Sequence, residues 1–296
     1  MLIENDEEYY IGELARTQSE VKHYLIEQGS LENIIDIFLI IKAVLPLIST
    51  ENDQDIYLGI GVPISMSIEK MRELSSKLKG EFNIKIRNEA TKEILEVKKN
   101  IKKVFVMPES YGSYYKFVSD HEDKTAVDSI VISLDLITEI MTIYEGKLMR
   151  TASRNLANAS LFVLAKKIAV ALQNQTNLII HPNTILNSIR NNQNIVTIAG
   201  KPYDISKVKE HYIRQISAEI VENLLDVLYV LPLDANIQYY IITGEALHLF
   251  WSEIEMLILE KNLLDDFDLD RIVKVKEPSF SNAIGFELMS IKKIGD

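Results

Sequence analysis

The chain contains no cysteine among its 296 residues. This absence excludes disulfide bonds, thiolate catalysis and every cysteine-ligated metal centre. The first ten residues are acidic and lack a basic segment followed by an apolar block, so we expect no secretory signal. Both features are typical of a protein of a reducing compartment, and we expect a cytoplasmic location.

Basic residues are in the minority, since 32 lysines and arginines face 43 aspartates and glutamates and give a net charge of −11. Proteins that bind nucleic acid directly concentrate Lys and Arg on one face, so we expect no direct contact with nucleic acid. One local exception is the segment "KKNIKK" at Lys98–Lys103. We interpret it as the solvated edge of a hairpin.

Long hydrophobic runs are also missing. The most apolar stretch, Ile34–Ile48, contains Asp36, Lys42 and Pro46. It is too short and too charged to cross a bilayer, so it predicts a buried helix and no membrane association.

Several catalytic motifs are absent as well. The five histidines are scattered without metal-ligand spacing, so we expect no metal site built on them. No G-x-S-x-G elbow and no G-x-x-x-x-G-K-[ST] loop occurs, which argues against α/β-hydrolases and P-loop enzymes.

What remains is the pattern of a globular α/β protein, with 47% hydrophobic and 25% charged residues and length enough for two domains. Strands alternate with long helices, which predicts mixed sheets covered by helices on both faces. The predicted strands are Ile56–Gly61, Lys103–Pro108, Ser129–Leu134, Ile137–Tyr144, Ile237–Thr243 and one within Asp268–Pro278. The predicted helices are Ser19–Gly29, Leu31–Pro46 with Ser30 as its cap, Ser65–Lys79, one from Glu109 or Ser110, Asn155–Asn174, Ile205–Leu228, Glu245–Leu259 and one within Ser279–Met289.

Glu109 is the strongest candidate for a functional carboxylate. It directly follows the strand "KVFVMP" at Lys103–Pro108, where a helix begins. Ligands of open α/β sheets lie at the carboxyl ends of the strands, which favours a functional role. The alternative is a carboxylate that only complements the dipole of the following helix.

A series of motifs, in order along nearly the whole chain, resembles the ParM/StbA family of plasmid-segregating actin-like ATPases. The motifs are "VFVMPES" at Val104–Ser110, "DSIVISLD" at Asp128–Asp135, "GKL" at Gly146–Leu148, "YYIGELA" at Tyr9–Ala15, "YLGIGVP" at Tyr57–Pro63, "IITGEA" at Ile241–Ala246 and "PSFSNAIGF" at Pro278–Phe286.

The resemblance implies an actin-like fold of the actin/Hsp70/sugar-kinase type, with two α/β lobes and ATP or ADP with Mg²⁺ between them. By this resemblance, residues 1–127 plus 278–296 form domain I, in an abbreviated form that lacks the first phosphate-binding hairpin. Residues 128–277 form domain II, with a smaller subdomain at about 155–209. Glu109 would match the glutamate that orients the attacking water.

The second phosphate-binding hairpin departs from the family pattern. Family members carry glycines there, because an amide without a Cβ can approach a phosphate closely. Here the sequence reads "SLDLIT" at Ser133–Thr138, with bulky residues near the glycine positions and about one residue fewer. Whether Ser133 or Asp135 stands for the metal-side aspartate stays open.

The resemblance assigns nucleotide contacts to Ser133, Asp135, Thr138, Thr243, Gly244 and Glu245. A glutamate beside Gly244 would repel a triphosphate, so no cofactor is assigned unless the site is functional, in which case it is ATP or ADP with Mg²⁺. Enzymatic activity stays open. We favour an actin-like structural protein that forms or regulates filaments with a degenerate nucleotide site. The alternative is an ATP-hydrolysing filament that segregates plasmid DNA through a DNA-bound adaptor. In both cases the main partner is another actin-like subunit.

Overall fold

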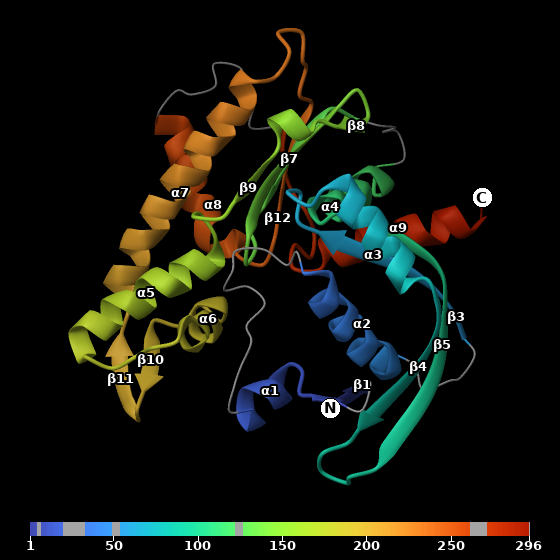
Figure 1. The fold of residues 1–296 in the computed structure, drawn as a ribbon. Helices are drawn as coiled ribbons and strands as arrows, with labels where there is room; N and C mark the ends of the chain where they lie inside the picture. The colour runs from blue at the N-terminus through green and yellow to red at the C-terminus, as the bar shows by residue number, and fades with distance from the viewer. Residues whose placement is uncertain (5–6, 20–32, 49–53, 122–126, 261–270, 296) are drawn as a thin grey trace. The chain divides into compact units, whose positions relative to one another are not determined.

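The computed structural model describes residues 1–4, 7–19, 33–48, 54–121, 127–260 and 271–295 (Figure 1). The chain divides into two compact units. The first unit comprises Met1–Met107 with Met289–Asp296, and the second unit comprises Pro108–Leu288. These limits differ from the predicted domain boundaries at residues 127/128 and 277/278, which stay a prediction.

The first unit is built on a five-stranded sheet with the order β2-β1-β4-β5-β3. Its strands are β1 (Leu2–Glu4), β2 (Glu7–Tyr9), β3 (Gln54–Val62), β4 (Gly80–Arg87) and β5 (Ile94–Pro108), and its helices are α1 (Glu13–Gln18), α2 (Ile34–Ile48) and α3 (Ile68–Leu78). Two apolar clusters join α2 and α3 to the sheet, with Ile37 and Leu45 among their buried members. Ser67 caps α3, since its side chain accepts a hydrogen bond from the Lys70 amide at 3.3 Å.

The second unit is built on a six-stranded sheet with the order β13-β12-β6-β7-β8, and β9 also pairs with β7. Its strands are β6 (Ser129–Ser133), β7 (Thr138–Tyr144), β8 (Lys147–Leu148), β9 (Arg154–Leu156), β12 (Tyr239–Thr243) and β13 (Ile272–Lys274). Strand β12 runs parallel to both β6 and β13, whereas β6 and β7 form the antiparallel hairpin that the sequence predicts. A separate hairpin joins β10 (Ile195–Ile198) and β11 (Lys201–Asp204).

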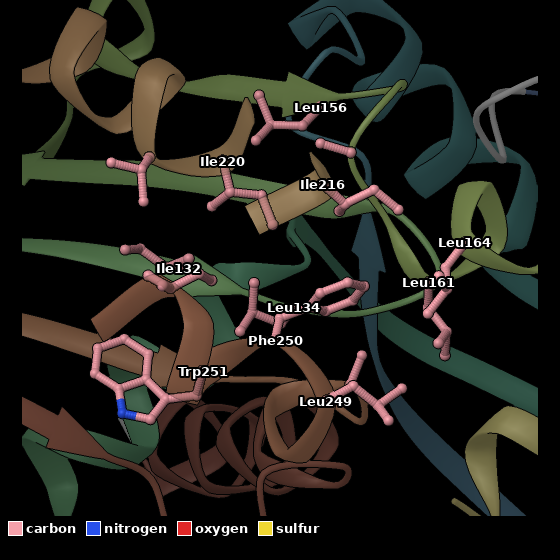
Figure 2. Packing of buried hydrophobic residues seen from close by; sticks show 14 of the residues in the cluster. Ile132, Leu134, Leu156, Leu161, Leu164, Ile216, Ile220, Leu249, Phe250 and Trp251 are labelled. Carbon is pink, nitrogen blue, oxygen red and sulfur yellow. The ribbon is translucent and has the colours of Figure 1, made fainter. Parts of the chain in front are cut away.

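Helices cover both faces of this sheet, which explains why every residue of β6 is buried. The helices of this unit are α4 (Ser110–Ser119), α5 (Leu161–Thr176), α6 (Pro182–Arg190), α7 (Ser206–Tyr229), α8 (Leu247–Glu260) and α9 (Ser281–Gly295), and a short 3-10 turn, η1, spans Arg150–Ala152. Helix α6 packs on α5 and on the β10–β11 hairpin. Helices α5, α7 and α8 form one large apolar core with Ile132 and Leu134, shown in Figure 2. Helix α4 contacts β6, β7 and β12.

Two sequence predictions are wrong in detail. The helix predicted from Asn155 begins at Leu161, because Arg154–Leu156 pairs with β7 and the Ser160 side chain caps the helix by accepting from the Val163 amide. Lys99 is fully buried and does not lie on a solvated edge. Strand alternation places it on the same face as the buried residues Val97 and Ile101.

The predicted helix Ser19–Gly29 and the predicted cap Ser30 lie outside the described residues, apart from Ser19 itself, which directly follows α1. No helix within the described ranges combines the length and the apolar character needed to cross a membrane.

Candidate functional site

The connection between β6 and β7 fills the position of the predicted phosphate loop. The Asp135 carbonyl accepts a hydrogen bond from the Leu161 amide at 3.1 Å, and the Leu136 carbonyl accepts from the Phe162 amide at 3.4 Å. These contacts satisfy amides in the first turn of α5 that have no partner within the helix. The loop therefore presents carbonyl oxygens to the helix start.

The Asp135 carboxylate joins this loop to the end of β12. Its Oδ1 accepts from the Glu245 amide at 2.7 Å, and its Oδ2 accepts from the Ser133 hydroxyl at 2.7 Å. Burial raises the pKa of Asp135, and the Glu245 charge adds to this rise. The two hydrogen bonds and the Arg190 charge oppose it, because they favour the ionised carboxylate.

Gly244 brings the two loops into backbone contact. It has a φ of 103°, and a Cβ at this position would lie 2.3 Å from the Leu134 carbonyl oxygen. The Leu134 amide donates to the Thr243 carbonyl at 2.8 Å, and the Ala246 amide donates to the Leu134 carbonyl at 2.8 Å. Only a glycine fits this close approach at a positive φ.

An ion pair ties the same loop to α6. Arg190 Nη2 lies 2.7 Å from Glu245 Oε1, and Nε donates to the same oxygen at 3.2 Å. The pair is partly exposed, so its net contribution to stability is small. Its effect is positional, because it holds the Glu245 side chain against the last residue of α6.

Glu109 lies at the beginning of α4 with helical backbone angles, and its side chain makes no capping hydrogen bond. Burial of the carboxyl group among surrounding protein atoms raises the pKa of Glu109 to about 8, and the charges of Glu139, Asp135 and Glu245 add to the rise. Glu109 as a whole residue nevertheless stays exposed. Water therefore reaches Glu109 and screens the charges around it.

Glu139 completes a group of four carboxylates. It is buried in β7, and its Oε2 accepts from the Ser110 hydroxyl at 2.8 Å. Its neighbour Thr138, which the resemblance assigned to nucleotide binding, is fully buried, and the Thr138 hydroxyl has no hydrogen-bond partner.

A second polar network includes Thr243, at the end of β12. The Ser113 hydroxyl is 3.1 Å from Thr243 Oγ1 and 2.6 Å from Ser281 Oγ, and it donates to Asn282 Oδ1 at 2.6 Å. This network connects α4, β12 and α9. It gives a structural reason for the asparagine in the motif "PSFSNAIGF", because Asn282 Oδ1 also accepts from the Ser113 amide at 3.1 Å.

The structure thus brings together five of the predicted residues, namely Ser133, Asp135, Thr243, Gly244 and Glu245, and places the Glu109 charge close to them. The residues that sequence reasoning missed are Glu139, Arg190, Ser110, Ser113 and Ser281. A signal existed only for Glu139, the one charged residue in strand β7. Among the described residues, no group of three or more His, Asp or Glu side chains is arranged to hold a metal ion.

Replacing Glu109 with glutamine is expected to stabilise the protein at high pH. A carboxyl group whose pKa is raised in the folded state costs stability as the pH rises from its ordinary value near 4.5 to about 8. The variant escapes this cost, so its free energy of unfolding should exceed that of the wild type by about 1 kcal/mol at pH 8.5 and by little at pH 5. The expected difference is well below what the full pKa shift would give, because solvent screens an exposed group.

Urea unfolding of both proteins at the two pH values measures this difference. Glu287→Gln, an exposed glutamate of α9, serves as the control. An equal difference in the free energy of unfolding at pH 5 and pH 8.5 would contradict a raised pKa of Glu109.

The comparisons with known proteins agree with this geometry. Residues 1–112 match the family model described as "Actin like proteins N terminal domain". This part of the chain is similar to the N-terminal domain of actin-like proteins. The resemblance seen in the sequence motifs, and the α/β actin-like fold that it implied, are both confirmed. A comparison with curated protein sequences gave no match.

Solved structures of actin homologues share the fold of this chain. An archaeal actin homologue, Ta0583, superposes with a TM-score of 0.70 at 16% identity, covering 89% of this chain and 78% of its own. The actin-like protein Alp7A gives a TM-score of 0.70 at 15% identity, covering 99% and 83%. A 15-stranded ParM filament from Clostridium botulinum gives 0.69 at 15% identity, covering 97% and 82%. Such low identities show the fold alone.

Proposed function

We propose that this actin-like protein forms or regulates filaments in the cytoplasm and that its nucleotide site is degenerate. The observation that carries the proposal is the hydrogen bond from the Glu245 amide to Asp135 Oδ1, at 2.7 Å. A carboxylate of the chain itself thereby accepts a hydrogen bond from an amide at the position where the resemblance expects nucleotide contacts.

The residues present do not fit a triphosphate. Phosphate sites in proteins offer unpaired backbone amides and positive charge. Here the amides of Leu134, Glu245 and Ala246 all donate to acceptors within the protein. The side chains in the vicinity include four carboxylates, and Arg190, the positive charge that contacts one of them, is paired with Glu245. Bringing a triphosphate to this region would add strong like-charge repulsion.

Self-association is supported by the similarity to a ParM that is itself a filament. In this proposal the contacts between subunits do not depend on nucleotide turnover. The main partner is therefore another actin-like subunit.

A second candidate function is ATP-driven assembly that segregates DNA through a DNA-bound adaptor. Glu109 favours it, because a carboxylate with a raised pKa at the end of a strand is suited to accept a proton from water. One structure of the archaeal homologue is a complex with ADP, with a TM-score of 0.67 at 15% identity over 89% of this chain and 80% of its own.

The thermal unfolding midpoint with and without millimolar ATP–Mg²⁺ separates the two candidates. A ligand that binds the folded state at a hundred times its Kd adds about 2.7 kcal/mol of stability. We expect no rise in the midpoint and equal pelleting of the protein with and without nucleotide. A clear rise, pelleting that requires ATP, and loss of phosphate release in Glu109→Ala would together establish the second candidate instead.

A further inference from the structure

Strand β3 forms one edge of the sheet in the first unit, since it is last in the strand order β2-β1-β4-β5-β3. Within the described part of the chain, β3 pairs only with its neighbour β5. Its other edge therefore carries a row of backbone N–H and C=O groups that no strand of those residues takes up. Such an edge is a template for pairing with another strand.

The other edge strands are protected from such pairing, and β3 is not. Natural proteins keep sheet edges short or place charged residues and proline on them. The opposite edge strand of the same sheet, β2, has three residues, and two of them are glutamates. In the second unit, β13 has three residues and β8 has two, and each includes a lysine. Strand β3 has nine residues, contains no proline or lysine, and carries a single charge, on Asp55.

The two faces of β3 differ in their side chains, because alternate residues of a strand point to opposite faces. On one face the side chains join the apolar clusters that α2 and α3 share with the sheet, and these residues are Ile56, Leu58, Ile60 and Val62. The opposite face carries Asp55, Tyr57, Gly59 and Gly61. Asp55 is exposed and Tyr57 is 40% exposed, so this face offers one aromatic ring beside two positions without a side chain.

A second copy of β3 can pair with this edge in one register that uses the whole strand. In an antiparallel pair, two residues directly opposite each other point their backbone groups either both toward the partner strand or both away from it. Residue numbers that face each other must therefore both be odd or both be even. The register that pairs all nine residues meets this condition, and it is centred on Leu58, which then faces Leu58 of the second copy.

This register matches the side chains on both faces of the strand. On the face of the apolar clusters, Ile56 lies opposite Ile60, and such β-branched pairs stabilise a sheet. On the other face, Tyr57 lies opposite Gly59 of the second copy, so that the aromatic ring covers a glycine, an arrangement that favours strand pairing. Asp55 lies opposite Gly61. The two Asp55 carboxylates are then six positions apart along the pair, about 20 Å, and like charges do not meet.

We infer that two copies of this chain associate by antiparallel pairing of their β3 strands about a two-fold axis at Leu58. The contact uses the same surface on both copies, so it is complete with two copies and does not extend into a chain of subunits. The two five-stranded sheets join into one continuous sheet, and both open edges are removed. This dimer goes beyond the proposed function, because it requires neither a filament nor a nucleotide.

Tyr57→Asp tests the side-chain contacts of this dimer. Tyr57 is exposed and points away from the apolar clusters, so the fold should be retained. The change removes the ring over Gly59 twice, once from each copy, and sets two carboxylates at diagonal positions of the pair. The dissociation constant of the dimer, measured by sedimentation velocity on protein that does not pellet, should rise about 30-fold. Tyr229→Asp, at an exposed tyrosine of α7, is the matched control and should leave the constant unchanged.

A single introduced cysteine reads the register directly, because the chain has no cysteine of its own. Leu58→Cys places the two thiols of the dimer directly opposite each other, with Cβ atoms about 4.5–5.5 Å apart, close to the separation that a disulfide needs. Ile60→Cys is the matched control on the same face, since its two thiols would lie four positions apart along the pair, about 14 Å. Mild oxidation should link most of the Leu58→Cys protein into a dimer on a non-reducing gel and should leave Ile60→Cys unlinked.

The outcomes separate this inference from the proposed function. A wild-type chain without a dimer at any accessible concentration overturns the β3 pairing, and so does a dimer that Tyr57→Asp does not weaken. Equal cross-linking of Leu58→Cys and Ile60→Cys overturns it as well, because the register is then wrong. Filaments that form alike from the wild type and from Tyr57→Asp, without a Leu58→Cys cross-link, keep the proposed function and overturn only this contact. A dimer cross-linked at Leu58→Cys that never pellets establishes the contact and counts against self-assembly into filaments.

Discussion

Replacing Gly285 with alanine is expected to destabilise the second unit by more than about 3 kcal/mol, because two helix backbones touch at this residue. A Cβ on Gly285 would lie 1.8 Å from the Gly112 carbonyl oxygen and 2.4 Å from its carbon. These atoms belong to the backbone of α4, which cannot move aside as a side chain can. Helices α4 and α9 would have to separate, and the network of Ser113, Ser281 and Asn282 would break with them.

Chemical unfolding followed by circular dichroism measures the loss. Gly112→Ala should behave in the same way, since its Cβ would meet the Asn282 carbonyl oxygen at 2.2 Å. Glu287→Ala, an exposed change on α9 near Gly285, should leave the stability almost unaltered. A Gly285→Ala protein as stable as this control would show that the two helices do not meet at their glycines.

Gly244→Ala is expected to have the second-largest effect, a loss of about 3 kcal/mol that combines backbone strain with a clash. The φ of 103° is unfavourable for any residue with a Cβ, and this Cβ would lie 2.3–2.6 Å from three backbone atoms of Leu134. The hydrogen bonds of Leu134 to Thr243 and Ala246 depend on the same contact.

Gly200→Ala separates the two causes. Gly200 also has a positive φ, 77°, but no atom lies within 4 Å of the position of its Cβ. The free energy of unfolding of this variant should fall by about 1 kcal/mol, which is the cost of the backbone conformation alone. Equal losses in Gly200→Ala and Gly244→Ala, measured by the same unfolding curves, would mean that the Leu134 contact adds nothing.

The fold was largely readable from the sequence, because its strands and helices carry strong local signals. The hairpin from Asp128 to Leu148 is an example. Its two apolar strands pair as expected, and Glu145 and Gly146 form the turn with φ angles of 50° and 68°. The long helix α7 was predicted within one residue at each end, since its apolar residues recur with the helical period.

The wrong predictions lie where a tertiary contact, and not the local sequence pattern, decides the structure. The segment at Asn155 is compatible with a helix, but pairing with β7 makes it a strand, and β-pairing depends on a partner that the local pattern does not show. Lys99 reads as a surface residue by its type, whereas its strand position turns it inward. Local patterns do not reveal which strand a segment will join.

The candidate site was only partly readable. Loss of glycine from the β6–β7 connection is a property of the sequence, and so is the glutamate after Gly244. The hydrogen bond from the Glu245 amide to Asp135 could not be predicted from the sequence. The two residues are 110 positions apart and meet only when β6 and β12 lie side by side. Arg190 could not be identified either, because its partner Glu245 is 55 positions away in the sequence.

The parallel pairing of β6 with β12 also bears on how the protein is made. Ser129 aligns with Tyr239, so the ribosome synthesises β6 long before β12, the strand that pairs with one of its edges. The β6–β7 hairpin can form early from local contacts, but the opposite edge of β6 then carries unpaired backbone groups while the helical segments between them are translated. We expect nascent chains that end before residue 239 to aggregate or to need a chaperone, since an open apolar strand edge invites pairing with other chains.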